Sequence, residues 1–162
     1  MRKTIIAATA SVLFAATAHA EMAAPAAAPT YGQPGVNLEQ ATKAVEAAIA
    51  EAKKNGLLMA VAVVSNSGFL VHFSKMDQTQ FASIEIAIDK AKGAAMFRRP
   101  TKVFEDRANG GGPSVLSLRG VVASEGGIPL MRDGKVIGAI GCSGGTSAQD
   151  GEACKAGAAT IK

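Results

Sequence analysis

The stretch FASIEIAIDKAKGAAMFRRPTKVF, residues 81–104, decides how the rest of the chain folds. Its apolar residues recur at helical spacing and form one stripe, which consists of Ile84, Ala87, Ile88, Ala91, Ala94 and Ala95. We expect a helix from Ser83 to Arg98, with Ser83 as its cap and Pro100 as its stop. Because the stripe is mostly alanine, it cannot form a core alone, and the helix needs a sheet to lie on.

Short apolar segments on either side of this helix predict the sheet. Residues 57–64 and 69–73 flank a turn of Ser, Asn and Gly, and residues 128–132 and 135–140 flank Asp133-Gly134, a favoured hairpin turn. A further short strand is expected at 121–123. Together these segments predict one α+β domain with an antiparallel sheet of about five strands flanked by helices.

Three further helices are expected around the sheet. Asn37 and Gln40 resemble a capping box for a first helix that Gly56 ends. Thr101 can cap a short helix over residues 102–108, and Ser147 and Asp150 look like the cap and third residue of the last helix.

The N-terminal region has the pattern of an export signal. A basic start is followed by an apolar run over residues 5–18 and by the small-x-small sequence Ala18-His19-Ala20. The run is short for a membrane-spanning helix, so we predict a signal peptide at 1–20, with an uncleaved anchor as the alternative. Residues 21–36 read as a disordered Ala- and Pro-rich linker, and 37–162 as the domain. The protein is therefore expected to be periplasmic or secreted.

The net charge argues against one class of partner, and the two cysteines allow one disulfide. After removal of Arg2 and Lys3, 15 basic and 13 acidic residues remain, and a net charge of +2 is too small to indicate nucleic acid. Cys142 and Cys154 are the only cysteines, and export makes a disulfide between them feasible. The bond requires the last helix to fold back along the preceding strand; a buried free thiol at a strand end is the alternative.

Several motifs suggest chemistry without completing a site. Residues 141–145 fit G-x-S-x-G, but no histidine follows them, which argues against a serine hydrolase. His72, the only histidine after residue 20, could bind a metal or haem iron with Met76 as a second ligand, or could be an ordinary surface residue. The sequence has no C-x-x-C-H motif, which excludes covalent c-type haem. Lys90 and Glu125 could serve acid–base chemistry if buried, although solvated charges are commoner.

A family resemblance rests on several of these segments together. The pattern comprises Met76-Asp77, Ser83, Ala87, Lys90-Ala91, Ala94, FRRPT at 97–101, EGGIP at 125–129, VIGAIGCSG at 136–144 and Gln149-Asp150. It resembles the haem-binding GlcG-like family, which includes HbpS and the C-terminal domain of PduO corrinoid adenosyltransferases, and it covers residues 37–162.

The resemblance implies a profilin-like fold, assembly into homo-oligomers and haem as a cofactor. If haem binds, the candidate cofactor-binding residues are His72, Met76, Lys90, Arg98, Arg99, Thr101 and Glu125. The family itself has no single agreed catalytic set to transfer. Two functions follow: an exported haem- or tetrapyrrole-binding protein concerned with haem, iron or redox sensing, or a small enzyme acting on haem or on an organic acid of glycolate or propanediol metabolism. We favour the first, because no complete catalytic set is evident. No metal site, nucleic-acid partner or membrane insertion of the mature domain is expected.

Overall fold

A computed structural model of the chain describes residues 35–162. The predicted signal peptide and residues 21–34 of the predicted linker lie outside the described residues. Val36, the last residue of that predicted linker, belongs to the domain, because its side chain is buried and its N–H donates to the Ile137 carbonyl at 2.8 Å.

The described part forms one α+β unit. Its elements in order are α1 (Leu38–Lys54), β1 (Ala60–Ser65), β2 (Leu70–Lys75), α2 (Ala82–Phe97), α3 (Lys102–Asn109), the 3-10 helix η1 (Pro113–Ser117), β3 (Gly127–Arg132), β4 (Lys135–Ser143) and α4 (Ser147–Ala158). None of the helices within residues 35–162 is both long and apolar enough to cross a membrane.

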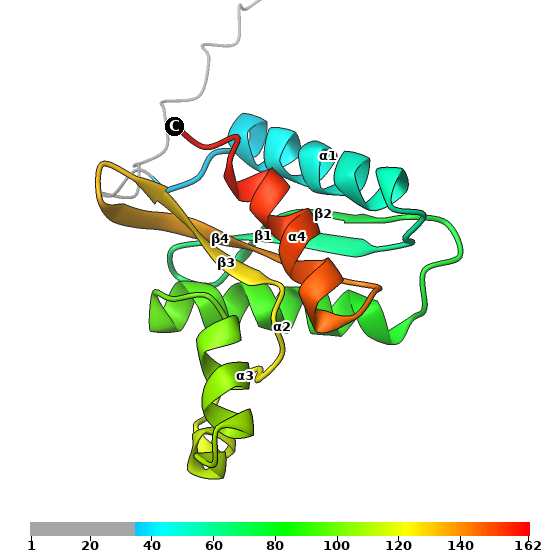
Figure 1. Ribbon diagram of the computed structural model, residues 1–162. Coiled ribbons are helices and arrows are strands. Elements are labelled where there is room, and N and C mark those ends of the chain that lie inside the picture. The colour runs from blue at the N-terminus through cyan, green and yellow to red at the C-terminus, as the bar shows by residue number, and fades with distance from the viewer. Residues whose placement is uncertain (1–34) are drawn as a thin grey trace, which may run out of the picture. The chain divides into compact units, whose positions relative to one another are not determined.

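The two predicted hairpins join into one antiparallel sheet with strand order β2-β1-β4-β3. The central strands β1 and β4 come from different hairpins and pair from Ala60 opposite Ser143 to Ser65 opposite Gly138. Helix α2 covers one face of the sheet, and α1 and α4 lie side by side on the other (Figure 1). This three-layer arrangement confirms the predicted fold class.

Helix α2 lies very close to the sheet, and its alanine stripe faces the strands. Ala87, Ala91, Ala94 and Ala95 pack with Ala60, Ala62, Val64 and Ala139 in a core built almost entirely of small side chains. At Gly141 of β4 the helix backbone comes so near that a Cβ atom would stand 2.0 Å from the Ala87 carbonyl oxygen. Glycine is therefore required there by the close approach of two backbones.

The opposite face holds the larger core, and a disulfide joins two of its elements. Val61 and Val63 of β1 point into it, together with buried residues of α1 and α4. Cys142 of β4 and Cys154 of α4 are bonded, with their Cα atoms 5.7 Å apart and neither side chain exposed. The last helix does fold back along β4, so of the two alternatives for these cysteines the disulfide is the one that forms.

The sheet has four strands among the described residues, so the expected strand at 121–123 is wrong. Gly120 adopts a left-handed conformation with φ of 82°, and the N–H of Val121 bonds to Leu118 in a turn. A Cβ at Gly93 of α2 would lie 3.1 Å from the Gly120 carbonyl and 3.9 Å from the Val122 nitrogen. This segment therefore runs along α2, where no strand is available to pair with it.

The predicted caps of α2 and α4 differ from the structure, whereas the Asn37–Gln40 capping box of α1 is confirmed. Ser83 lies inside α2 with its hydroxyl turned to the interior. Thr101 stands at the N-cap position of α3, as predicted, but its side chain makes no capping hydrogen bond. For α4, Thr146 is the cap and Gln149 the third residue. The side chains of Ser83, Thr101 and Asp150 are thus free of capping roles and can bond to other parts of the fold.

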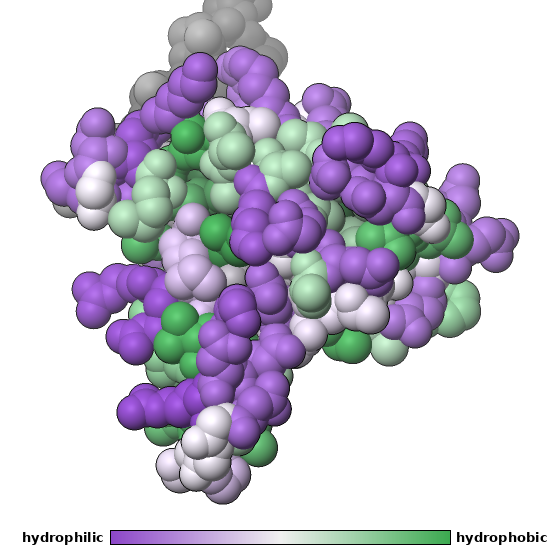
Figure 2. Space-filling view, in the orientation of Figure 1, coloured by the Kyte–Doolittle hydropathy of each residue, from purple (hydrophilic) through white to green (hydrophobic). Residues whose placement is uncertain are grey.

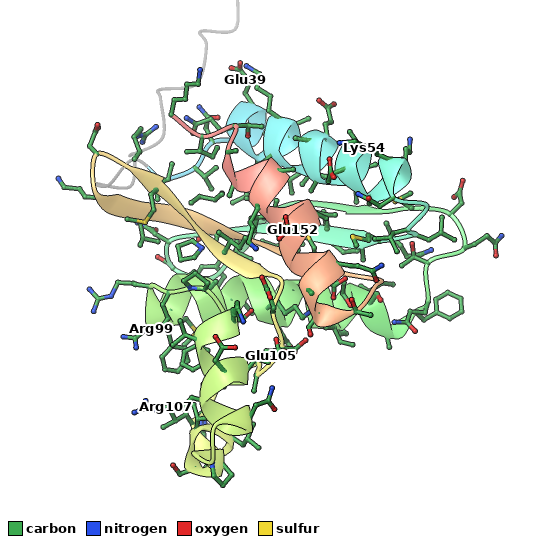
Figure 3. All side chains as sticks on the ribbon, viewed as in Figure 1. Glu39, Lys54, Arg99, Glu105, Arg107 and Glu152 are labelled. Atoms are coloured by element: carbon green, nitrogen blue, oxygen red, sulfur yellow. A yellow bond between two sulfur atoms is a disulfide. The ribbon has the colours of Figure 1, made fainter. Side chains whose placement is uncertain are left out.

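Between α2 and β3 the chain makes a projection, residues 98–119, which we call the arm. It contains α3 and η1 and extends away from the sheet (Figure 1). On the face shown in Figure 2, hydrophilic side chains run down α3 and apolar side chains appear beside them. Figure 3 shows Arg99 and Arg107 on one side of the arm and Glu105 on the other.

Candidate functional site

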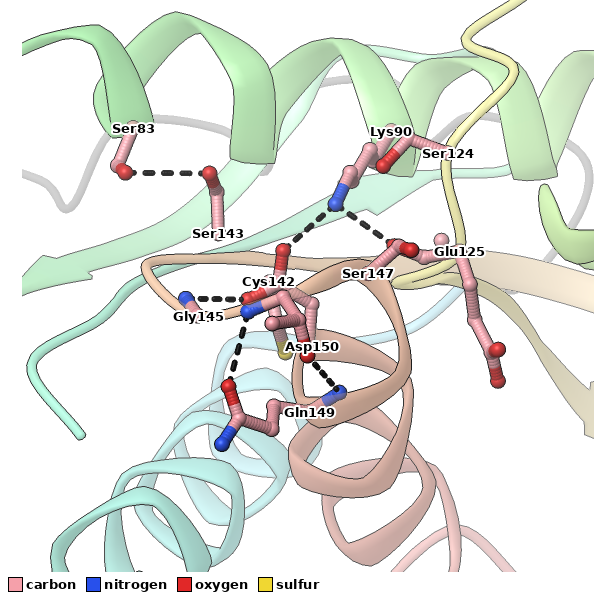
Figure 4. A network of polar contacts seen from close by, with 12 residues as sticks. Ser83, Lys90, Ser124, Glu125, Cys142, Ser143, Gly145, Ser147, Gln149 and Asp150 are labelled. Atoms are coloured by element: carbon pink, nitrogen blue, oxygen red, sulfur yellow. Dashed lines mark hydrogen bonds and ion pairs between the residues drawn. The ribbon is translucent and has the colours of Figure 1, made fainter. Parts of the chain in front are cut away.

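The central feature of the candidate site is a buried ion pair between α2 and α4. The ammonium nitrogen Nζ of Lys90 lies 2.7 Å from Oδ2 of Asp150, and the two side chains are only 2% and 4% exposed. Nζ also donates to the Glu125 carbonyl oxygen at 2.7 Å. One lysine therefore connects α2, the segment before β3 and the first turn of α4 (Figure 4).

Asp150 is held from its other side by backbone. Its Oδ1 accepts from the Gly145 N–H at 2.9 Å, so the glycine-rich turn after β4 binds a carboxylate of the protein itself. Burial raises the pKa of Asp150 above its ordinary value of 3.8, although the hydrogen bond and charge of Lys90 and the backbone N–H groups oppose this. The buried Asp150 carboxylate therefore binds a proton more readily than a free aspartate does.

Glycines 126 and 127 allow the cluster to close. Gly126 has φ of 124°, and a Cβ there would stand 2.8 Å from the Cys142 carbonyl oxygen and 3.0 Å from the lysine Nζ. At Gly127 a Cβ would lie 2.3 Å from the Lys90 carbonyl oxygen. The Glu125-Gly126-Gly127 sequence is therefore needed for the backbone to pass the lysine.

Thr101 fixes the same segment from the base of the arm. Its hydroxyl donates to the Ser124 carbonyl at 2.7 Å and accepts from the Gly127 N–H at 2.9 Å. The side chain is fully buried, and both hydrogen-bonding roles of the hydroxyl are in use. Thr101 thus fixes residues 124–127, where the chain enters β3.

Glu125 lies at the outer rim of the cluster. Its Oε1 is 3.2 Å from the Lys155 ammonium, and its backbone N–H donates to Glu105, which also accepts from the Ser147 hydroxyl at 2.8 Å. The pKa of Lys155 is raised, chiefly by its hydrogen bond to Glu152 and then by the one to Glu125. These contacts join α3 to α4 through Glu105.

His72 and Met76 lie on the far edge strand, separate from this cluster. A bulge in β2 places His72 opposite Val63 and Leu70 opposite Val64, so His72 faces the α1 side of the sheet. Val71 packs on the α1 side of the sheet and Phe73 on the α2 side, so these two side chains lie on opposite faces.

The two residues are poorly placed to act as a pair on one iron. Met76 follows the end of β2, and in an extended chain four residues span about 13 Å. Its thioether sulfur already accepts from the Met59 N–H at 3.3 Å. His72 is half-buried and remains the better placed nitrogen ligand of the two.

The remaining candidates, Arg98 and Arg99, are exposed at the start of the arm. Arg98 ends α2 in a left-handed conformation, and Nε of Arg99 donates to the Phe97 carbonyl at 3.1 Å. The seven candidates thus occupy three places: Lys90, Thr101 and Glu125 around the ion pair, His72 and Met76 at β2, and the two arginines on the arm. Within residues 35–162, no group of three or more His, Cys, Asp or Glu side chains could hold a metal ion.

Comparison with known proteins agrees with this architecture. The family described as "Haem degrading protein HbpS-like" matches residues 36–159. The chain belongs to this family. Escherichia coli K12 Protein GlcG is 37% identical over 105 residues, which are 65% of this chain and 78% of that protein.

Two solved structures extend the similarity to three dimensions. A double mutant of Streptomyces reticuli HbpS superimposes with a TM-score of 0.75 at 30% identity, covering 86% of this chain and 98% of that one. The PduOC:heme complex gives 0.72 at 26% identity, covering 79% of this chain and 96% of that one. The fold of this HbpS-like chain is therefore that of its family.

Sequence reasoning missed the acidic half of the cluster in this HbpS-like chain. The sequence predicts a role in helix capping for Asp150 and does not single out Glu105. It also does not indicate the contact between the Ser83 and Ser143 hydroxyls, which lie 3.1 Å apart. A signal for Asp150 was present, because it stands four residues before Cys154 and so shares a helix face with it. A disulfide between Cys154 and Cys142 of β4 turns the helix face that carries Asp150 towards the sheet.

Proposed function

We propose that the protein is an exported binder of haem or a related tetrapyrrole, acting in haem or iron handling or in redox sensing. The observation that carries this proposal is its similarity to HbpS and to the PduOC:heme complex over most of the domain. The family description, with the word haem in it, supports the same ligand class.

His72 is the iron ligand in this proposal. It is the only histidine in the described residues, and it is half-buried, so the residue keeps some exposed surface. Haem iron commonly takes a histidine nitrogen as its protein ligand. Lys90 and Thr101 are less suitable ligands, because their polar atoms are buried and already bonded within the protein.

Export is supported by two features of the chain. Residues 1–20 have the composition of a secretory signal. The Cys142–Cys154 disulfide suits an oxidising compartment, where such bonds persist. Assembly into a homo-oligomer completes the proposal, and light scattering on the purified protein measures it.

Titration with haem and with iron-free protoporphyrin IX tests the binding. The wild-type chain is expected to bind haem in fixed stoichiometry with a defined Soret band. In His72→Ala the Soret maximum should shift and haem affinity should fall, whereas affinity for the iron-free ring should stay the same, because only iron ligation is removed. Met76→Leu is the matched control and should leave the haem spectrum unchanged.

The two parts of the proposal fail separately in this experiment. An unchanged haem spectrum in His72→Ala would mean that another residue binds the iron. Failure of the wild-type chain to bind either ring in fixed ratio would refute tetrapyrrole binding itself.

The family description also favours a second candidate, turnover of haem. It is tested on the same complex by adding a reductant in air and following the Soret band. Decay of the band in the protein complex, faster than for free haem at the same concentration, would indicate an enzyme. A stable band would leave binding as the function.

A further inference from the structure

The arm carries the whole net charge of the described domain. Residues 98–119 contain five basic side chains and two acidic ones, whereas the rest of residues 35–162 contains ten of each. The basic residues are Arg98, Arg99, Lys102, Arg107 and Arg119, and all five are exposed. A projecting element of 22 residues therefore concentrates a charge that is balanced elsewhere.

Most of this positive charge has no carboxylate partner within the arm. Asp106 pairs with Lys102 at 2.7 Å, and Glu105 accepts from Ser147 and from the Glu125 backbone. The four arginines make no ion pair with either acid. Figure 3 shows Arg99 and Arg107 on the side of the arm opposite Glu105. That side is open to an anionic partner.

Exposed apolar side chains accompany the arginines. Val103, Leu116 and Leu118 are 42%, 62% and 47% exposed, while Phe104 and Val115 are the only buried residues of α3 and η1. An apolar surface bordered by cations is typical of segments that lie at a membrane interface, where apolar side chains reach the acyl boundary and cations meet the headgroups. Arginine suits this role because its guanidinium binds phosphate oxygens in pairs.

We propose that the arm docks the protein peripherally on an anionic phospholipid surface. Val103, Leu116 and Leu118 enter the headgroup region, and Arg98, Arg99, Arg107 and Arg119 contact lipid phosphates. A second copy of the chain is a poorer occupant. Outside the arm, the ten acidic residues of the described domain are balanced by ten basic ones, so a second copy offers no net negative charge to the arginines.

Co-sedimentation of the chain without its predicted signal peptide, residues 21–162, with vesicles tests the proposal, because the basic and apolar segment 1–20 would itself bind an anionic vesicle. Vesicles of phosphatidylcholine alone provide the baseline, and vesicles with phosphatidylglycerol provide the anionic surface. Arg99→Ala/Arg107→Ala should reduce partitioning to the anionic vesicles about 30-fold, because each cation near such a surface contributes about fivefold. Binding should also weaken as salt is raised.

Matched variants separate the arm from the rest of the surface. Lys53→Ala/Lys135→Ala removes the same charge from exposed positions on α1 and β4 and should change partitioning much less. Leu116→Ser should weaken binding, whereas Leu38→Ser, at a side chain of almost equal exposure (61%), should not.

Three outcomes overturn the proposal. If the lysine double variant loses as much vesicle binding as the arginine double variant, only the net charge of the protein matters. Equal binding to neutral and anionic vesicles would exclude recognition of phosphate charge. Arm variants that dissociate an oligomer while vesicle binding is unchanged would assign the arm to contacts between copies of the chain.

Discussion

Replacing Lys90 with methionine should destabilise the domain strongly, because Asp150 would remain buried without its cation. The Lys90 and Asp150 side chains are 2% and 4% exposed and 2.7 Å apart. Breaking such a buried pair from one side typically costs about 3–5 kcal/mol. We expect losses of that size in the free energy of unfolding for Lys90→Met and for Asp150→Asn at neutral pH.

The double variant Lys90→Met/Asp150→Asn should be more stable than either single variant. It leaves no buried charge, and the asparagine oxygen can still accept from Gly145. What remains lost is mainly the hydrogen bond to the Glu125 carbonyl, about 1–3 kcal/mol. Urea unfolding of the four proteins measures this directly. Losses that simply add in the double variant would refute the view that the two charges are coupled.

The pH dependence of the single variants supplies an independent check. Burial already raises the pKa of Asp150, and without Lys90 one opposing influence disappears. The folded state of Lys90→Met then binds more protons than the unfolded chain, so its stability should fall as pH rises through the folded pKa. Its deficit should shrink as pH is lowered towards 3.8, the ordinary value. Asp150→Asn, which removes the carboxyl group, should not show this slope.

Two further predictions concern the core. Ala91→Leu should lower the free energy of unfolding by about 1–3 kcal/mol through overpacking, because Ala91 is fully buried beside Gly141; an unchanged urea midpoint would place the alanine stripe at the surface. Mass spectrometry of the non-reduced protein should find no alkylatable thiol, and reduction should cost about 3 kcal/mol for a bridge with 12 residues' separation; two free thiols would exclude the bond.

The fold was largely predictable because its local patterns are strong. The alanine stripe of residues 84–95 and the Asp133-Gly134 turn each indicate one structure, and the paired hairpins leave few ways to build a sheet. The strand expected at 121–123 failed for a reason outside its own sequence. A strand needs a neighbour, and packing of residues 120–122 against Gly93 removes them from the sheet edge.

The helix caps show how tertiary contacts compete with local preference. Ser83 is a good capping residue, but its hydroxyl instead meets that of Ser143, 60 residues away. For α4 the information was present, because Thr146-Ser147-Ala148-Gln149 fits the capping-box spacing with Thr146 as cap. Choosing Ser147 shifted the assignment by one residue and gave Asp150 a capping role.

The candidate site was only partly predictable. Lys90 and Glu125 were singled out as residues that could serve acid–base chemistry if buried, and the structure places both in one cluster. Nothing in the spacing of Lys90 and Asp150 shows that they meet, because contact depends on the antiparallel placement of β4 between β1 and β3. The separation of His72 from the cluster likewise follows from strand order, with β2 and β3 at opposite edges.

The 60-residue separation of Lys90 and Asp150 has a consequence for the order of assembly during synthesis. Helix α2 and the first hairpin are made long before β4 and α4, so Lys90 initially has no anion to bind. Burying it early would leave an unpaired charge in the interior, which disfavours a closed N-terminal intermediate. The domain should therefore stay open until its last helix emerges, a property compatible with threading through a translocation channel before folding.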